Sequence, residues 1–284
     1  GHKKGEIVSG LVQRVERGSL FIDLGRATGV IPYEEQIPGE RFRPGERIRA
    51  YLNAVDEGFR GVYLRLSRAH PKFIVKLFEM EAPELAAGSI EVKNIAREPG
   101  SRTKIAIASV DPHVDPVGSL VGQRGVRVST VMSELGGERI DIIEWSEDQK
   151  AFIKESLSPA TVLEVVLDEA EHRAAVTVSE DQQSLAIGRG GQNVRLAAKL
   201  TGWNIDINAV GGDKPAEEEA VVSATPEDAG TPSEEAEVAP SEMPAEVVAD
   251  DSISKTERPA EEELAKNEEG DESAVDAKAS RDEA

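Results

Sequence analysis

The sequence contains no cysteine, few aromatic residues and no long hydrophobic run. Without cysteine, the 284-residue chain has no disulfides, thiolate metal ligands or cysteine nucleophile, as is usual in the reducing cytoplasm. No segment approaches the roughly 20 apolar residues that span a bilayer. The polar residues 1–5 lack the character of a signal peptide. We therefore expect a cytoplasmic protein that does not enter a membrane.

Catalytic patterns are also scarce. The four histidines (His2, His70, His113 and His172) are scattered without the spacing of metal ligands, and no P-loop, G-x-S-x-G or H-E-x-x-H string occurs. Acidic pairs such as Asp168-Glu169 are typical of solvated turns. The sequence therefore predicts a protein that is not an enzyme and holds no cofactor or metal.

Negative charge is concentrated near the C-terminal end. The formal net charge of −21 by itself disfavours nucleic-acid binding. Residues 213–284 hold 24 acidic and 6 basic residues and no aromatic, whereas residues 1–212 hold 30 acidic and 27 basic ones. A segment so poor in apolar side chains buries too little surface to offset its ordering entropy, so we predict a disordered acidic tail. The remainder is nearly neutral, and its charge does not exclude nucleic acid.

Residues 5–68 predict five closely spaced β-strands. Alternating apolar positions mark strands at residues 7–15, 20–24, 29–32, 47–55 and 62–67, and glycines mark the turns between them. Closing five short strands into a barrel removes the unpaired edges of the sheet. We therefore predict a small five-stranded barrel of the OB type.

Three strings in this segment, at residues 5–12, 23–25 and 29–32, resemble the RNA-binding barrel named after ribosomal protein S-one. The resemblance implies that bases stack on aromatic side chains of the second and third strands, with Phe21 as the RNA-binding candidate. Pro32 stands where many members have histidine. Two alternatives remain open: a shift of one residue exposes Leu20 instead, or Phe21, Tyr51 and Tyr63 are all core residues.

An internal repeat follows the barrel. Gly122-Gln123-Arg124-Gly125 and Gly188-Arg189-Gly190-Gly191 lie 66 residues apart, and residues 137–142 match residues 202–207. Each copy has an alternating strand upstream (104–108, 174–178), an amphipathic helix downstream (125–135, 191–200) and an earlier helical stretch (72–85, 147–157). The sequence therefore predicts two copies of one α/β module.

The repeated glycines suit the binding of phosphate. Two glycines around a tight turn leave the backbone N–H groups at the next helix start open to an anion, and the helix dipole adds partial positive charge. Arg124 and Arg189 add ionic attraction. A single G-x-x-G is usually a plain turn, but two copies in matching frames, each with an arginine, favour a pair of phosphate-binding loops.

This pattern resembles the KH module, in the order of elements found in bacteria. The resemblance implies RNA contacts from the loops, at Gly122, Gln123, Arg124 and Gly125 and at Gly188, Arg189, Gly190 and Gly191. It also implies contacts from the helix starts, at Arg127, Gln192 and Asn193.

The order of one barrel and two KH modules resembles the NusA family of bacterial transcription elongation, termination and antitermination factors. Strings at residues 76–85, 115–125, 137–145, 185–197 and 200–207 carry this resemblance, which covers about residues 4–209. It implies binding to RNA polymerase and to nascent single-stranded RNA, and other Nus factors as possible partners. We expect the polymerase-binding N-terminal domain of the family to be absent from this sequence.

We therefore predict an α+β multidomain protein. An OB-fold barrel at residues 4–69 precedes KH modules at 70–145 and 146–210 and a disordered acidic tail at 211–284. The predicted function is that of a monomer that binds RNA and polymerase and modulates elongation, pausing, termination and antitermination. The alternative is an RNA-binding or protein-scaffolding module without a polymerase role. The tail, a tethered polyanion, is predicted to compete with RNA.

Overall fold

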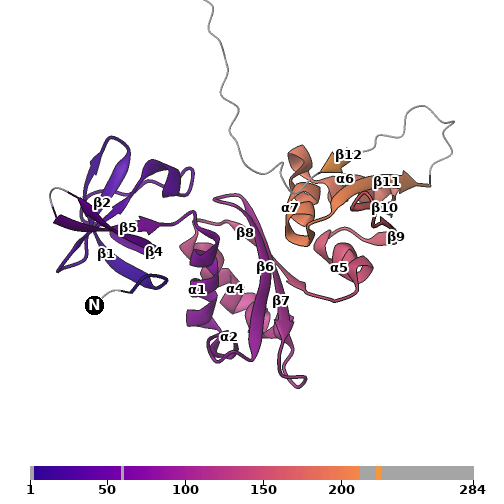
Figure 1. The fold of residues 1–284 in the computed structure, drawn as a ribbon, viewed down its shortest axis with the longest axis horizontal. Helices are drawn as coiled ribbons and strands as arrows, with labels where there is room; N and C mark the ends of the chain where they lie inside the picture. Colours follow the sequence, from indigo (N-terminus) through magenta and orange to yellow (C-terminus); the bar gives the residue numbers. More distant parts are fainter. Residues whose placement is uncertain (1–2, 59–60, 212–221, 225–284) are drawn as a thin grey trace, which may run out of the picture. The chain divides into compact units, whose positions relative to one another are not determined.

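The computed structural model describes residues 3–58, 61–211 and 222–224, which form a barrel and two α/β modules (Figure 1). In these residues no helix has the length and apolar character needed to cross a bilayer. Within the same ranges, no three His, Asp or Glu side chains are grouped to hold a metal ion.

The N-terminal module is a five-stranded barrel, as predicted. Its strands are β1 (Ile7–Glu16), β2 (Ser19–Asp23), β3 (Thr28–Ile31), β4 (Arg47–Gly58) and β5 (Gly61–Ser67). They close in the order β1-β2-β3-β5-β4, and only the β3–β5 pair is parallel. Alternate residues such as Val8, Ile22 and Leu66 fill the interior. The period-2 pattern of the sequence therefore gives both the strands and their buried face.

In the first α/β module, helices cover one face of a three-stranded sheet (Figure 1). Its elements are α1 (Pro71–Glu81), α2 (Pro83–Ala86), β6 (Ile90–Glu98), β7 (Arg102–Ser109), α3 (Pro116–Val121), α4 (Val126–Glu134) and β8 (Arg139–Glu144). The sequence predicts one helix at 72–85, but the helix ends before Pro83. Ala82 is extended, with φ −119° and ψ 99°, because the following proline disfavours the helical region there.

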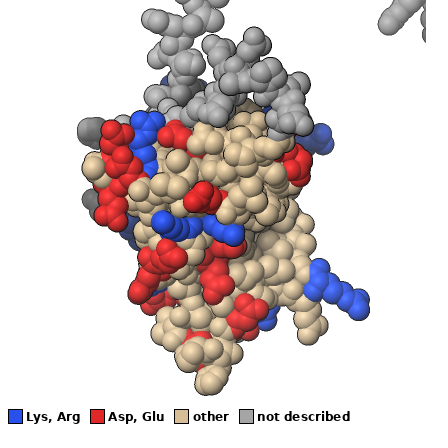
Figure 2. Space-filling model, turned by 90° about the vertical axis from the view of Figure 1, so that its right-hand side faces the viewer, with Lys and Arg blue, Asp and Glu red and all other residues tan. Residues whose placement is uncertain are grey.

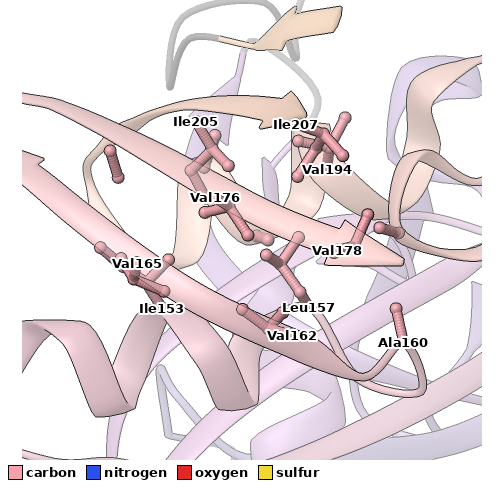
Figure 3. Packing of buried hydrophobic residues seen from close by; sticks show 14 of the residues in the cluster. Ile153, Leu157, Ala160, Val162, Val165, Val176, Val178, Val194, Ile205 and Ile207 are labelled. Carbon is pink, nitrogen blue, oxygen red and sulfur yellow. The ribbon is translucent and has the colours of Figure 1, made fainter. Parts of the chain in front are cut away.

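The second α/β module repeats this order. It contains α5 (Gln149–Ser156), β9 (Val162–Asp168), β10 (Arg173–Ser179), α6 (Glu180–Ile187), α7 (Gln192–Thr201) and β11 (Asn204–Val210). In both modules the first two strands are antiparallel and the last two are parallel. Figure 3 shows aliphatic side chains from α5, β9, β10, α7 and β11 packed into one core. Each module therefore has one strand, β6 or β9, that the sequence analysis did not identify.

One short strand comes from the predicted tail. β12 (Val222–Ala224) pairs antiparallel with the edge strand β11, with Ser223 opposite Asp206. The prediction of disorder throughout residues 213–284 is therefore wrong for these three residues, because the open edge of β11 accepts a fourth strand. The rest of the predicted tail lies outside the described residues.

The two α/β modules share a buried contact. Ala96, Ala106 and Ile143 of the first sheet form one apolar cluster with Phe152, Leu196 and Leu200 of α5 and α7. Residues 102–107 of β7 are buried on both faces, because the helices of the first module cover one face and this cluster the other. Burial within this contact lowers the pKa of Lys104 to about 8, although Asp141 partly opposes the shift.

Candidate nucleic-acid interface

The two glycine loops have the same backbone conformation. We call residues 122–125 loop 1 and residues 188–191 loop 2. Their first glycines have φ/ψ of 74°/173° and 78°/171°, and their last glycines 74°/17° and 73°/12°. The third position is left-handed in both, with Arg124 at 55°/25° and Gly190 at 59°/26°. The duplication seen in the sequence is therefore also a duplication of loop geometry.

The first glycine of each loop is required by packing as well as by its φ. A Cβ on Gly188 would lie 2.8 Å from both the backbone N and the Cβ of Asn193. A Cβ on Gly122 would lie 2.7 Å from Cγ of Arg127. The loop therefore folds tightly against the start of the next helix, which brings the helix N-terminus to the surface beside the loop.

The loop arginines remain available to a ligand. Arg124 and Arg189 are exposed, and neither forms an ion pair within the described residues. The helices behind them, α4 and α7, have Gly125 and Gly191 as N-caps, which provide no capping side chain. A helix dipole and a free guanidinium at a loop without bulky side chains are a combination that attracts a phosphate.

The helix-start residues have other partners. Arg127 donates from Nη1 to Glu84 (3.0 Å) and to the Ser119 carbonyl (2.7 Å), so it braces loop 1. Gln192 donates from Nε2 to Glu98 (2.7 Å) and to the Ser101 hydroxyl (2.6 Å). Both side chains are partly buried, and Nη1 of Arg127 and Nε2 of Gln192 already have protein partners.

The expectation that Asn193 contacts RNA is wrong for its side chain. The side chain is fully buried, and Nδ2 donates to the carbonyls of Leu157 (3.0 Å) and Ala186 (2.9 Å). Its polarity therefore serves the core, where it ties the start of α7 to α5 and to the end of α6. In the sequence it could not be distinguished from an exposed residue, because those carbonyls lie 36 and 7 residues away.

A shallow groove of about 560 Å³ lies beside loop 1. It is lined by residues of α2, α3, loop 1 and α4, among them Glu84, Asp115, Gln123 and Val126. On the face seen in Figure 2, basic side chains lie singly among acidic ones, without a large basic patch.

The barrel presents Phe21 on its outer face. Leu20 and Ile22 are buried, so the alternative with Leu20 exposed is wrong. The Arg14 guanidinium lies 4.0 Å from the centre of the Phe21 ring. Of the three aromatics weighed as core residues, only Tyr51 is buried; Tyr63 is 39% exposed and Phe21 is half-buried. An aromatic ring beside an arginine is a surface on which a base can stack.

Two residues of the site were missed by sequence reasoning. Arg195 donates to the carbonyl of Gly190 in loop 2 (3.0 Å), and its guanidinium is paired with Glu98 of β6. No local pattern indicates this pair, because the two residues lie 97 positions apart.

The described fold is thus that of a protein with an OB-type barrel followed by two KH modules. Comparison with known families agrees with this class. Residues 1–67 match the S1 RNA binding domain, residues 68–145 the NusA-like first KH domain and residues 149–215 the NusA-like second KH domain.

Several relatives carry one printed name, transcription termination/antitermination protein NusA. The protein from Thermus thermophilus is 50% identical over 204 residues, 72% of this chain and 53% of that protein. The one from Rickettsia prowazekii is 48% identical over 208 residues, 72% of this chain and 41% of that protein. The one from Bacillus subtilis is 45% identical over 207 residues, 73% of this chain and 56% of that protein.

The chain therefore contains an S1 domain and two NusA-like KH domains, and the relatives that it resembles over 72–73% of its length carry the name NusA. It spans about half the length of the curated relatives it matches.

Proposed function

We propose that this chain binds single-stranded RNA through loop 1 and loop 2, with Phe21 of the barrel as a further stacking contact. The observation that carries the proposal is the repeated loop geometry, in which each tight glycine turn presents an unpaired arginine at an uncapped helix start. A phosphodiester can approach such a loop closely, because its glycines carry no side chains.

Two loops on adjoining modules act together on one RNA. The buried cluster between the modules holds Leu196 and Leu200 of α7 against the first sheet, which limits independent movement. Once one loop has bound a strand, the second meets it at high effective concentration, so neither loop has to bind tightly alone. A nearly neutral protein body is sufficient for binding of this kind.

The family supports a role in bacterial transcription, since the relatives are named for termination and antitermination. We infer that the RNA is the nascent transcript and that RNA polymerase is the protein partner of a cytoplasmic, monomeric and non-enzymatic factor. Other Nus factors are candidate partners. Pausing and termination assays with purified polymerase test this part: addition of the chain should change them, and loss of RNA binding should abolish the change.

Charge reversal in the loops tests the RNA proposal. The variants Q123D/R124D and R189D/G190D should each weaken binding of a single-stranded RNA at least tenfold at fixed salt, by losing ionic contacts and repelling phosphate. Asp tolerates the left-handed backbone of Gly190, so the fold should survive. Thermal unfolding checks that it does.

The matched control is K150D/K154D on α5, where both lysines are exposed. This control changes the formal charge by −4, more than the −3 of each loop variant. Equal losses of RNA affinity in the control and in the loop variants would mean that RNA binding depends only on the total charge of the chain. RNA affinity unchanged in both loop variants would overturn the proposal.

A further inference from the structure

The β6–β7 turn of the first KH module contacts the start of α7, the helix that follows loop 2 in the second module. Glu98, at the end of β6, accepts a hydrogen bond from Nε of Arg195 (2.7 Å) through Oε1, and the same oxygen forms an ion pair with Nη2 of Arg195 (2.6 Å). Its other oxygen, Oε2, accepts from Gln192 (2.7 Å). Gln192 also donates to Ser101, at the other end of the same turn (2.6 Å). One carboxylate thus holds two residues of the first turns of α7.

Arg195 transmits this contact to the loop. Its Nη1 donates to the carbonyl of Gly190 (3.0 Å), the residue in the left-handed third position of loop 2. Holding this carbonyl fixes the peptide plane between Gly190 and Gly191. Glycine is the residue whose backbone is least restricted, so a loop with three glycines gains most from such a restraint.

Loop 1 has a different support. Position 129, which corresponds to Arg195 in the repeat, is serine, and position 126, which corresponds to Gln192, is an exposed valine. Its third position is Arg124 instead of glycine, and it is braced within its own module by Arg127 bound to Glu84. The restraint from the neighbouring module is therefore specific to loop 2.

We propose that Glu98 is a positioning residue for RNA binding: through Arg195, the first KH module sets the conformation in which loop 2 of the second module receives a phosphate. This inference rests on the proposed RNA-binding function. It predicts that loop 2 binds RNA well only when the first module is docked beside it.

The test uses the sign of the change in RNA affinity. A carboxylate near a phosphate-binding loop repels RNA, so a purely electrostatic role predicts tighter binding when Glu98 is removed. A positioning role for Glu98 predicts weaker RNA binding when its side chain is removed. E98A should weaken binding of a single-stranded RNA about fivefold, the equivalent of roughly one lost hydrogen-bonded constraint.

Glu91 provides the matched control. It lies on the same strand, is exposed and pairs with Lys93 (2.8 Å), so E91A removes the same charge without touching loop 2. The E98A loss should persist in the Q123D/R124D background and vanish in R189D/G190D, because only the second pair of substitutions disables the loop that Glu98 positions.

Amide hydrogen exchange supplies a structural readout. E98A should speed exchange at Gly190 and Gly191 while Leu196 and Leu200 stay protected. Faster exchange throughout α7 would mean that the modules undock, and would overturn a specific role at the loop. The inference is also overturned if E98A matches E91A or tightens RNA binding. Failure of the wild-type chain to bind RNA would instead refute the proposed function itself.

Discussion

Substitution of the first glycine of loop 2 gives the strongest prediction about the loop. In G188A, alanine must adopt φ 78° and ψ 171°, a region that residues with a side chain rarely occupy. Its Cβ would also lie 2.8 Å from the backbone N of Asn193, a residue fully buried at the start of α7. The rigid start of a helix cannot rotate away as an exposed side chain can.

The magnitude follows from these two costs. Backbone strain of about 1–3 kcal/mol and overpacking of similar size predict that G188A lowers the free energy of unfolding by about 3–4 kcal/mol. G191A is the matched control, because its φ is also positive (73°) but the nearest atom to its Cβ is 4.0 Å away. Backbone strain alone predicts that G191A lowers the free energy of unfolding by about 1 kcal/mol.

Urea unfolding of both variants measures the difference, with RNA binding as a second readout. G188A should lose both stability and RNA affinity, whereas G191A should keep most of its stability. G122A should fall between them, because the clashing Arg127 side chain can move at the expense of its contact with Glu84. If G188A and G191A lose equal stability, the close approach to Asn193 does not determine the conformation of loop 2.

Three further predictions concern the barrel, the contact between the modules and the tail. F21A should weaken RNA binding about fivefold or more through lost stacking, and F21W should retain it; equal affinity of F21A and wild type would exclude Phe21 as a contact. The pKa of Lys104 is lowered to about 8 in the folded chain, so between pH 8 and 9.5 the unfolded chain binds more protons and stability rises with pH. In urea unfolding, the stability of wild type should rise by roughly 1–2 kcal/mol more than that of K104M across this interval, and parallel pH profiles of the two proteins would refute the assignment. Deleting residues 213–284 removes a formal charge of −18 and should tighten RNA binding at low salt but not at high salt; no change at low salt would show that the tail does not compete.

Local patterns predicted most of the fold. The barrel strands follow from alternating apolar residues, and α4 and α7 from apolar faces that end at glycines such as Gly202, which is left-handed (φ 79°). The missed strands β6 and β9 and the break at Ala82 reflect weaker signals. The proline rule could have placed that break, since Pro83 follows it directly.

The site was predicted in its loops but not in its supports. G-x-x-G and its arginines are contiguous in sequence, whereas the interactions that hold loop 2 join residues far apart, as in the Glu98–Arg195 pair. Asn193 shows the same limit: an amide beside a glycine loop fits RNA contact and core bonding equally well until the neighbouring carbonyls are placed. Polar residues that support a site are therefore the part that sequence periodicity does not identify.

The central claim is that both loops hold the same RNA strand. Mapping ultraviolet crosslinks between the full chain and a single-stranded RNA by mass spectrometry tests it directly. Crosslinked peptides should include residues 122–125 and residues 188–191, and both crosslinks should be lost when either loop variant is titrated below saturation. Crosslinks that avoid both loops, or that survive R189D/G190D and Q123D/R124D unchanged, would contradict it.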